Sequence, residues 1–259
     1  MSKLAANLTM LFTELPFLER FAAARHAGFD AVEFLFPYSY SVEQIAQQLK
    51  THALTLVLHN LPAGDWAAGE RGIACHPARV SEFRAGVADA IRYASALGVR
   101  QVNCLAGIAP QDASAEQARQ TLVDNLRFAA AALQESGIRL LIEPINTFDI
   151  PGFFLSGTQQ ALDLIAASGS DNIFIQYDIY HMQRMEGELS ATLRANLARI
   201  GHIQLADNPG RGEPGTGEIN YRHLFQLLDE VGYAGWIGCE YKPKSGTLEG
   251  LGWRAAHAL

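Results

Sequence analysis

Short apolar runs alternate with segments of helical periodicity from one end of the chain to the other. Runs such as LTLVLHNL and LLIEPI are almost entirely apolar, which is typical of parallel strands covered by helices. The pattern predicts eight strands, at Leu4–Thr9, Ala31–Phe36, Leu54–Leu61, Gln101–Ala106, Leu140–Ile145, Ile173–Ile179, Ile200–Ala206 and Trp236–Tyr241.

The segments between these strands carry helical stripes with recognisable ends. Phe17, Leu18 and Phe21 form one stripe, and Gly28 follows where that helix should stop. Ser41 precedes Gln44 by three positions, which is a capping-box pattern. We expect helices at about Glu14–Ala27, Ser41–His52, Val80–Leu97, Ala115–Glu135, Thr158–Ala167, Glu188–Ala198, Tyr221–Val231 and Leu248–Ala258.

Eight strands that alternate with eight helices favour an α/β fold, a closed (β/α)8 TIM barrel that forms a single domain over residues 1–259. The length of 259 residues suits one such barrel. An open doubly wound sheet is the alternative. It has little support, because no GxGxxG follows the first strand and no Walker A pattern occurs.

The charge balance and the cysteine content indicate which partners and which covalent features are not expected. The chain has 20 Lys and Arg against 27 Asp and Glu, a net charge of −7 and no basic stripe, so neither nucleic acid nor a membrane surface is expected as a partner. The three cysteines, Cys75, Cys104 and Cys239, are too widely spaced for a disulfide framework or a CxxC metal site. With no signal-peptide pattern and no long apolar stretch, a cytoplasmic location is expected.

Four polar residues stand near the ends of consecutive predicted strands, and in a barrel such ends carry the active site. Side-chain alternation allows all four to point inward at one mouth. Three carboxylates placed together repel one another, and a divalent cation is the usual remedy. A lone acidic residue at a strand end is more often solvated or salt-bridged, so the inference depends on the whole group. The group is Glu143, Asp178, Gln204 and Glu240. Its all-oxygen ligands suit Mg²⁺ or Mn²⁺ better than zinc.

Several long stretches of the chain are specific enough to indicate a family. They are Ala5–Leu8, GFDAVEFLFPY at Gly28–Tyr38, HNLPAGDWAAGERGIAC at His59–Cys75, LLIEPINTFDIPGF at Leu140–Phe153, IQYDIYHMQRMEGEL at Ile175–Leu189, and HIQLADNPGRGEPGTGEINY through WIGCEYKP. Together they resemble the hydroxypyruvate isomerase family, within the xylose isomerase-like TIM barrel superfamily, and the resemblance spans nearly the whole chain. 2-Oxo-tetronate isomerases form a close sister group, and the middle of the chain is more similar to the hydroxypyruvate enzymes.

This resemblance implies an activity and a set of roles. The implied reaction is an aldose–ketose isomerisation of hydroxypyruvate and tartronate semialdehyde (2-hydroxy-3-oxopropanoate), by metal-assisted proton transfer through an enediolate. Glu143 and Glu240 match the proton-transfer pair, and Asp178 and Gln204 complete the implied metal ligands. No organic cofactor is expected, and relatives suggest a homo-oligomer. Epimerase relatives usually have His at the position of Gln204, which argues against a ketose 3-epimerase.

A small anionic hydroxy-keto acid needs hydrogen-bond donors in the site. The candidates are His181, Lys242, Arg211 and His59, although each could instead be a wall, rim, loop or core residue. The loop after the third strand, with Trp66, is either a lid or a packed surface loop. Glu33 could be polar filler of the barrel. A 2-oxo-tetronate isomerase, a ketose 3-epimerase, a DNA-repair nuclease and a non-enzymatic binding module remain as alternative functions.

Overall fold

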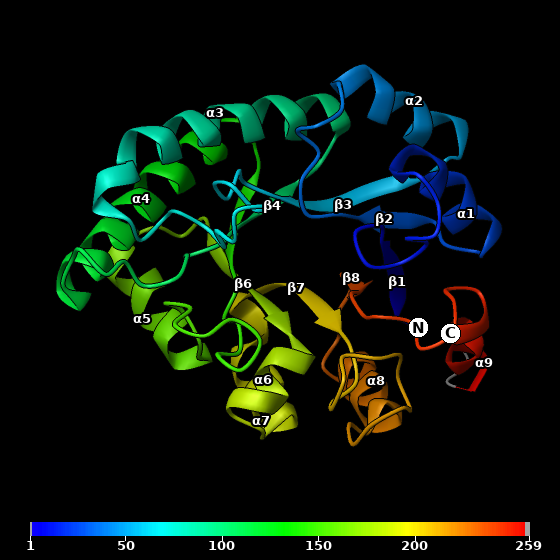
Figure 1. The fold of residues 1–259 in the computed structure, drawn as a ribbon. Helices are drawn as coiled ribbons and strands as arrows, with labels where there is room; N and C mark the ends of the chain where they lie inside the picture. Colours follow the sequence, from blue (N-terminus) through cyan, green and yellow to red (C-terminus); the bar gives the residue numbers. More distant parts are fainter. Residues whose placement is uncertain (1, 257–259) are drawn as a thin grey trace.

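In the computed structural model, which describes residues 2–256, eight parallel strands form one closed barrel (Figure 1). Each strand pairs with the next, and β8 pairs with β1 through Lys3 opposite Trp236. The expected fold class is therefore confirmed. The strands are β1 (Lys3–Asn7), β2 (Ala31–Glu33), β3 (Thr55–Asn60), β4 (Gln101–Cys104), β5 (Arg139–Ile142), β6 (Ile173–Asp178), β7 (Ile200–Leu205) and β8 (Trp236–Cys239).

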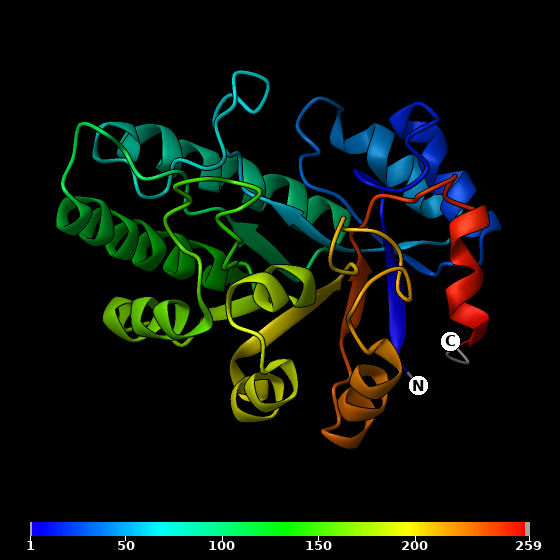
Figure 2. The ribbon, with the colours of Figure 1, turned by 60° about the horizontal axis from the view of Figure 1, so that its bottom comes forward.

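The helices lie outside the strands (Figures 1 and 2). The α-helices are α1 (Arg20–His26), α2 (Val42–Thr51), α3 (Val80–Leu97), α4 (Ala115–Glu135), α5 (Thr158–Ser168), α6 (Ile179–Met185), α7 (Leu189–Asn196), α8 (Tyr221–Glu230) and α9 (Trp253–Ala256). Four 3-10 helices accompany them among the described residues: Phe17–Glu19, Pro77–Arg79, Leu197–Arg199 and Glu249–Gly252.

The predicted elements correspond to the observed ones, with shifted ends and one omission. The predicted strands run past the observed ends, most of all at β2, which stops at Glu33 rather than at Phe36, and at β5, which stops at Ile142 rather than at Ile145. The helix expected from Glu14 begins as a 3-10 turn at Phe17, directly after Pro16. Helix α6 was not predicted at all. The last expected helix is a 3-10 turn followed by α9, and its positions 257 and 258 lie outside the described residues.

Two layers of side chains fill the inside of the barrel. One layer is apolar and contains Ala5, Ala31, Leu58 and Leu141. The other lies toward the carboxyl ends of the strands and is polar and buried: Asn7, Glu33, Asn60, Asn103, Gln176, His202 and Gln204. The polar layer therefore forms the floor of the mouth at which a barrel places its active site.

The loop after β3 lies against the loop after β4 through two glycines. A Cβ atom on Gly72 would come within 2.4 Å of the Leu105 carbonyl oxygen, and one on Gly107 within 2.5 Å of the Gly72 carbonyl oxygen. Both glycines have a positive φ, of 117° and 106°. An ion pair of 2.6 Å between Arg79 and Glu70 ties the same loop to the 3-10 helix before α3. These contacts hold Trp66 beside the mouth.

Helix α9 packs against α8 and against the end of α1, on the outside of the barrel. The Trp253 ring in α9 stacks on Phe225 of α8 at a centroid distance of 6.1 Å. Arg254 donates to the Ala27 carbonyl oxygen at the end of α1. The three cysteines are buried and free, as expected. Within residues 2–256, no helix is both long and apolar enough to cross a membrane.

Candidate active site

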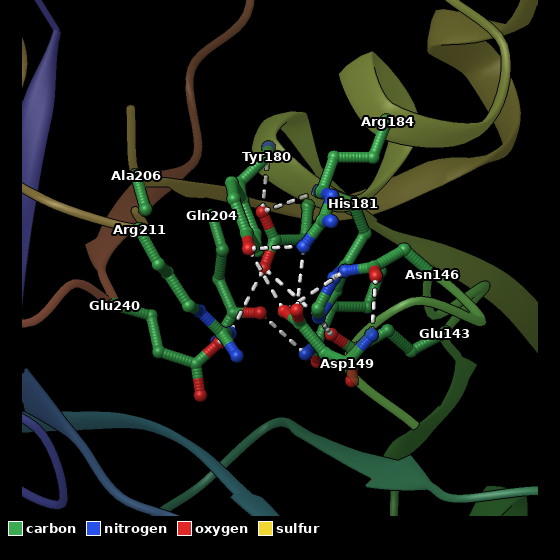
Figure 3. A network of polar contacts seen from close by, with 12 residues as sticks. Glu143, Asn146, Asp149, Tyr180, His181, Arg184, Gln204, Ala206, Arg211 and Glu240 are labelled. Carbon is green, nitrogen blue, oxygen red and sulfur yellow. Dashed lines mark hydrogen bonds and ion pairs between the residues drawn. The ribbon is translucent and has the colours of Figure 1, made fainter. Parts of the chain in front are cut away.

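The four residues singled out at the strand ends all lie at the carboxyl end of the barrel. Asp178 and Gln204 belong to β6 and β7, and Glu143 and Glu240 directly follow β5 and β8. Each is at least 93% buried, with 7% exposure for Glu240 as the largest. Glu143, Gln204 and Glu240 line a cavity of about 380 Å³, a size suited to a small ligand. Figure 3 shows these side chains converging with Arg211 and His181.

Asp178 is the last residue of β6 and directly precedes α6, the helix that was not predicted. Its Oδ1 accepts from the backbone N–H groups of Tyr180 at 2.8 Å and His181 at 3.4 Å, so the residue is the N-cap of α6. The other oxygen, Oδ2, is left facing the site. It lies 3.3 Å from Arg211 Nη2 and 3.5 Å from His181 Nε2. The cap thus fixes the carboxylate and sets the start of the helix that carries His181.

The hydrogen bonds of His181 decide which of its nitrogens carries the proton. Asn146 Oδ1 accepts from the backbone N–H groups of Phe148 and Asp149, so Asn146 Nδ2 is the end that faces the histidine. That amide donates to His181 Nδ1 at 2.6 Å. Burial lowers the pKa of His181 well below its usual value, so the ring is neutral. Its Nε2 therefore carries the hydrogen and donates toward the carboxylates.

Arg211 supplies the positive charge inside this acidic cluster. Its Nη2 donates to Glu240 Oε2 at 2.7 Å and to Asp178 Oδ2 at 3.3 Å, and its guanidinium lies over the Tyr180 ring at 5.3 Å. The Nε–H group is buried and has no hydrogen-bond partner among the described residues. One edge of the guanidinium therefore holds the site together, while the buried Nε–H is left without a hydrogen bond to the described residues.

Burial and mutual repulsion raise the pKa values of the carboxyl groups. Burial, followed by the charges of Glu240 and Asp178, raises the pKa of Glu143 well above its usual value. Burial also raises the pKa of Glu240 to about 8, although Arg211 opposes the shift. The pKa of Asp178 is raised for the same reason. Three ionised carboxylates against one guanidinium leave two negative charges unbalanced when His181 is neutral.

A divalent cation fits this donor set in charge and in chemistry. Single ligand atoms of Glu143, Asp178 and His181 lie within 4.8 Å of one another, close enough to share an ion, and Glu240 falls outside that close group. The proton on His181 Nε2 makes this histidine a donor to the carboxylates rather than a ligand. Oxygens of Glu143, Asp178, Gln204 and Glu240 remain, and oxygen donors suit a hard divalent cation.

The structure separates the four candidate substrate-binding residues. His181, Arg211 and Lys242 line the cavity, and Lys242 is exposed at its rim. His59 does not line it. Its ring lies on the outer side of β3, 6.1 Å from the Tyr38 ring, and burial lowers its pKa to about 4. The alternation along β3 turns Leu58 and Asn60 inward and His59 outward, so His59 is a core residue and that candidate is corrected.

Several buried partners of the site were not singled out from the sequence. Asn103 donates to Glu143 Oε2 at 2.8 Å, and Asn146 orients His181. Glu33, considered only as filler, is the hydrogen-bond partner of Asn7 on β1 and of His202 and Gln204 on β7. Inward-facing polar residues at strand ends were the available signal for Asn103 and Glu33. Nothing in the local sequence marks Asn146.

Fold and site together define a TIM barrel with a cluster of buried carboxylates at the carboxyl ends of its strands, where a metal ion could bind. The model of the xylose isomerase-like TIM barrel family matches residues 21–257, and the chain belongs to this family.

Two relatives match over the whole chain. The chain is 59% identical to hydroxypyruvate isomerase of Escherichia coli K12 over 98% of each protein. It is 46% identical to 2-oxo-tetronate isomerase of Cupriavidus necator, over 98% of this chain and 97% of the relative. The expected resemblance is confirmed. A crystal structure described as an AP endonuclease of family 2 from Brucella melitensis superposes with a TM-score of 0.96, at 44% identity over 99% of both chains.

Proposed function

We propose that this enzyme interconverts hydroxypyruvate and tartronate semialdehyde. The observation that carries the proposal is the buried pair of Glu143 and Glu240 in one small cavity. The 59% identity to the Escherichia coli hydroxypyruvate isomerase, against 46% for the four-carbon enzyme, favours the three-carbon acid.

The reaction is a proton shift with no net redox change. One proton leaves C3 of hydroxypyruvate and one is added at C2, while the proton of the C3 hydroxyl passes to the C2 oxygen. An enediolate links the two states. No organic cofactor is required, because no electrons leave the substrate.

The two glutamates meet the requirements for these steps. One must be ionised to accept the C3 proton, and the other must be protonated to deliver a proton to C2. The raised pKa values of Glu143 and Glu240 bring both groups toward the range in which each form is accessible near neutral pH. Asn103 donates to Glu143 Oε2 and Arg211 donates to Glu240 Oε2, so one oxygen of each carboxylate is held in place. In the reverse direction the two roles exchange.

The substrate carboxylate has a matched partner in Arg211. Arg211 lines the cavity, and its guanidinium supplies the positive charge and N–H donors that bind a carboxylate. The His181 Nε2–H lies opposite, and Lys242 contributes positive charge at the rim. Apolar walls from Trp66, Ile145 and other residues exclude water from the reacting carbons.

Mg²⁺ or Mn²⁺, held by Glu143, Asp178, Gln204 and Glu240, would supply Lewis-acid polarisation of the substrate oxygens. Such a cation also balances the two negative charges that Arg211 leaves uncompensated.

Turnover of metal-stripped protein tests the proposal. We expect loss of hydroxypyruvate only after Mg²⁺ or Mn²⁺ is restored, with a higher kcat/KM than for 2-oxo-tetronate. A higher kcat/KM for 2-oxo-tetronate would leave the proposed proton-transfer chemistry in place but would make the four-carbon acid the substrate. Turnover of neither acid by protein that has bound the cation would refute the isomerase proposal and favour a ketose 3-epimerase or a binding module.

The description of the Brucella melitensis structure raises DNA as another substrate class. This chain has a net charge of −7 and 27 acidic against 20 basic residues, which disfavours a phosphate backbone as partner. We expect no binding of duplex DNA even at low salt, where such binding is strongest.

A further inference from the structure

A fourth buried carboxylate lies in the floor of the cavity, and the proposed chemistry does not use it. Glu33 on β2 is wholly buried. Its Oε1 accepts from Asn7 Nδ2 at 2.9 Å and from Gln204 Nε2 at 2.7 Å, and its Oε2 lies 2.6 Å from His202 Nε2. A buried charge is costly without such partners, so this arrangement has to be explained.

The opposite strand is shaped around this carboxylate. Gly238 on β8 is the inward-facing position two residues before Glu240. A Cβ atom there would lie 2.3 Å from Glu33 Oε1 and 2.4 Å from Oε2. No side chain fits at this position while Glu33 occupies the axis of the barrel.

Glu33 determines which end of the Gln204 amide faces the cavity. With Nε2 donating to Glu33, the amide oxygen is the other end, where Gln176 Nε2 donates to it at 2.6 Å. A flipped amide would place two acceptors 2.7 Å apart at Glu33 and two donors 2.6 Å apart at Gln176. Only the oxygen end of an amide binds a hard cation.

We propose that Glu33 is a positioning residue for the cation site, which holds Gln204 with its oxygen turned toward the cavity. The pairing also explains why β7 carries an amide. A carboxylate at position 204 would face the Glu33 carboxylate directly, whereas the amide donates to Glu33 with one end and offers oxygen with the other. This inference rests on the proposed metal-dependent function.

Binding of Mn²⁺ to the metal-stripped protein, measured by calorimetry without substrate, tests the role of Glu33. We expect Glu33→Met to weaken binding by about tenfold or more, as loss of such supporting contacts commonly does. In Glu33→Gln, the new amide oxygen accepts from Asn7 and Gln204 while its nitrogen donates to His202. This variant should therefore stay within about threefold of the wild type.

The double variant shows whether Glu33 acts through Gln204. In a Gln204→Met background, Glu33→Met should weaken Mn²⁺ binding no further. Asn125→Ala is the matched control, since Asn125 is buried and donates to Ala74, and neither residue lines the cavity. It should lower the melting temperature and leave Mn²⁺ affinity unchanged.

A second test does not depend on whether Glu33→Met folds. An added anionic ligand normally strengthens cation binding, and the positioning role of Glu33 predicts the opposite at position 204. Gln204→Glu adds an anionic ligand but should weaken Mn²⁺ binding, because the new carboxylate meets Glu33. Adding Glu33→Gln should recover the affinity.

The outcomes separate this inference from the proposed function. Unchanged affinity in Glu33→Met, an equal loss in the Gln204→Met background, or tighter binding in Gln204→Glu would each overturn the positioning role alone. Failure of the wild type to bind Mn²⁺ at all would overturn the metal-dependent function as well.

Discussion

Glu143 and Glu240 are the two residues whose chemistry the proposed reaction requires. Glu143→Gln and Glu240→Gln should each lower kcat by about 10²–10⁴-fold, because an amide neither accepts nor delivers the proton. Purified variants assayed with hydroxypyruvate and saturating Mg²⁺ give the comparison. Glu135→Gln, at the exposed end of α4, is the control and should retain full activity. A kcat near the wild-type value in either active-site variant would remove that glutamate from the mechanism.

The raised pKa of Glu240 makes the stability of the metal-free protein depend on pH. Its folded pKa of about 8 exceeds the usual 4.5, so the folded state retains a proton that the unfolded state has lost. The resulting stabilisation is fully present below pH 4.5 and is lost as pH rises through 8. As pH rises from 6.5 to 8.5, the melting temperature of the metal-free wild type should therefore fall more than that of Glu240→Gln.

A bound cation should oppose this loss of stability at high pH. Mn²⁺ stabilises the ionised carboxylates, so saturating Mn²⁺ should protect the wild type more at pH 8.5 than at pH 6.5. Differential scanning fluorimetry of both proteins, with and without Mn²⁺, provides the data. Parallel pH curves for the metal-free wild type and Glu240→Gln would show that Glu240 is ionised throughout.

The sequence contained enough to predict the four strand-end residues, since the carboxyl ends of barrel strands meet at one mouth. It did not contain enough to predict their partners. Glu33 and His202 are 169 positions apart and meet only because the barrel closes. His59 was misplaced because a local pattern does not define which face of β3 points inward. The register shift between β2 and β3 adds to that uncertainty.

At the level of elements, the segment after β7 positions Arg211. Asp207 Oδ2 accepts from the backbone N–H groups of Gly215 and Gly217, and its Oδ1 accepts from those of Asn208 and Ile219. These four bonds fold the loop so that Arg211 reaches Glu240. A single buried side chain therefore connects the loop conformation to substrate binding.

Asp207→Asn should loosen this loop, because one end of the new amide cannot accept a hydrogen bond. Loss of such bonds costs about 1–3 kcal/mol, so KM for hydroxypyruvate should rise by about tenfold with a smaller fall in kcat. In an Arg211→Met background the same change should leave KM unaltered. An equal effect of Asp207→Asn in both backgrounds would show that the loop does not act through Arg211.

Helix α6 shows why one element escaped prediction. The apolar run IFIQYDIY continues from β6 into the helix without Gly or Pro, so the predicted strand extends to Ile179. The break is made by the Asp178 carboxylate, which caps the helix while also facing the site. Asp178 was therefore singled out for its place at the strand end, while its role as a helix cap was missed.

For the molecule as a whole, the sequence pattern predicted alternating strands and helices, and closure of the barrel was an inference from their number. The pairing of β8 with β1 confirms it. Closure brings Glu33 and Asn7 of the first two strands beneath Gln204 and Glu240 of the last two. The active site is thus a property of the closed ring, with its floor and its reacting groups supplied by opposite ends of the chain.

Isomerisation of hydroxypyruvate in D₂O by the Mg²⁺-loaded enzyme, followed by NMR, tests the central claim most directly. Transfer through two exchangeable carboxyl groups predicts deuterium at C2 of tartronate semialdehyde, at a rate far above that of a sample without enzyme. The label should be absent with Glu143→Gln or Glu240→Gln. Product that forms without solvent deuterium would show that hydrogen moves directly between the carbons, and would contradict the proton-transfer account.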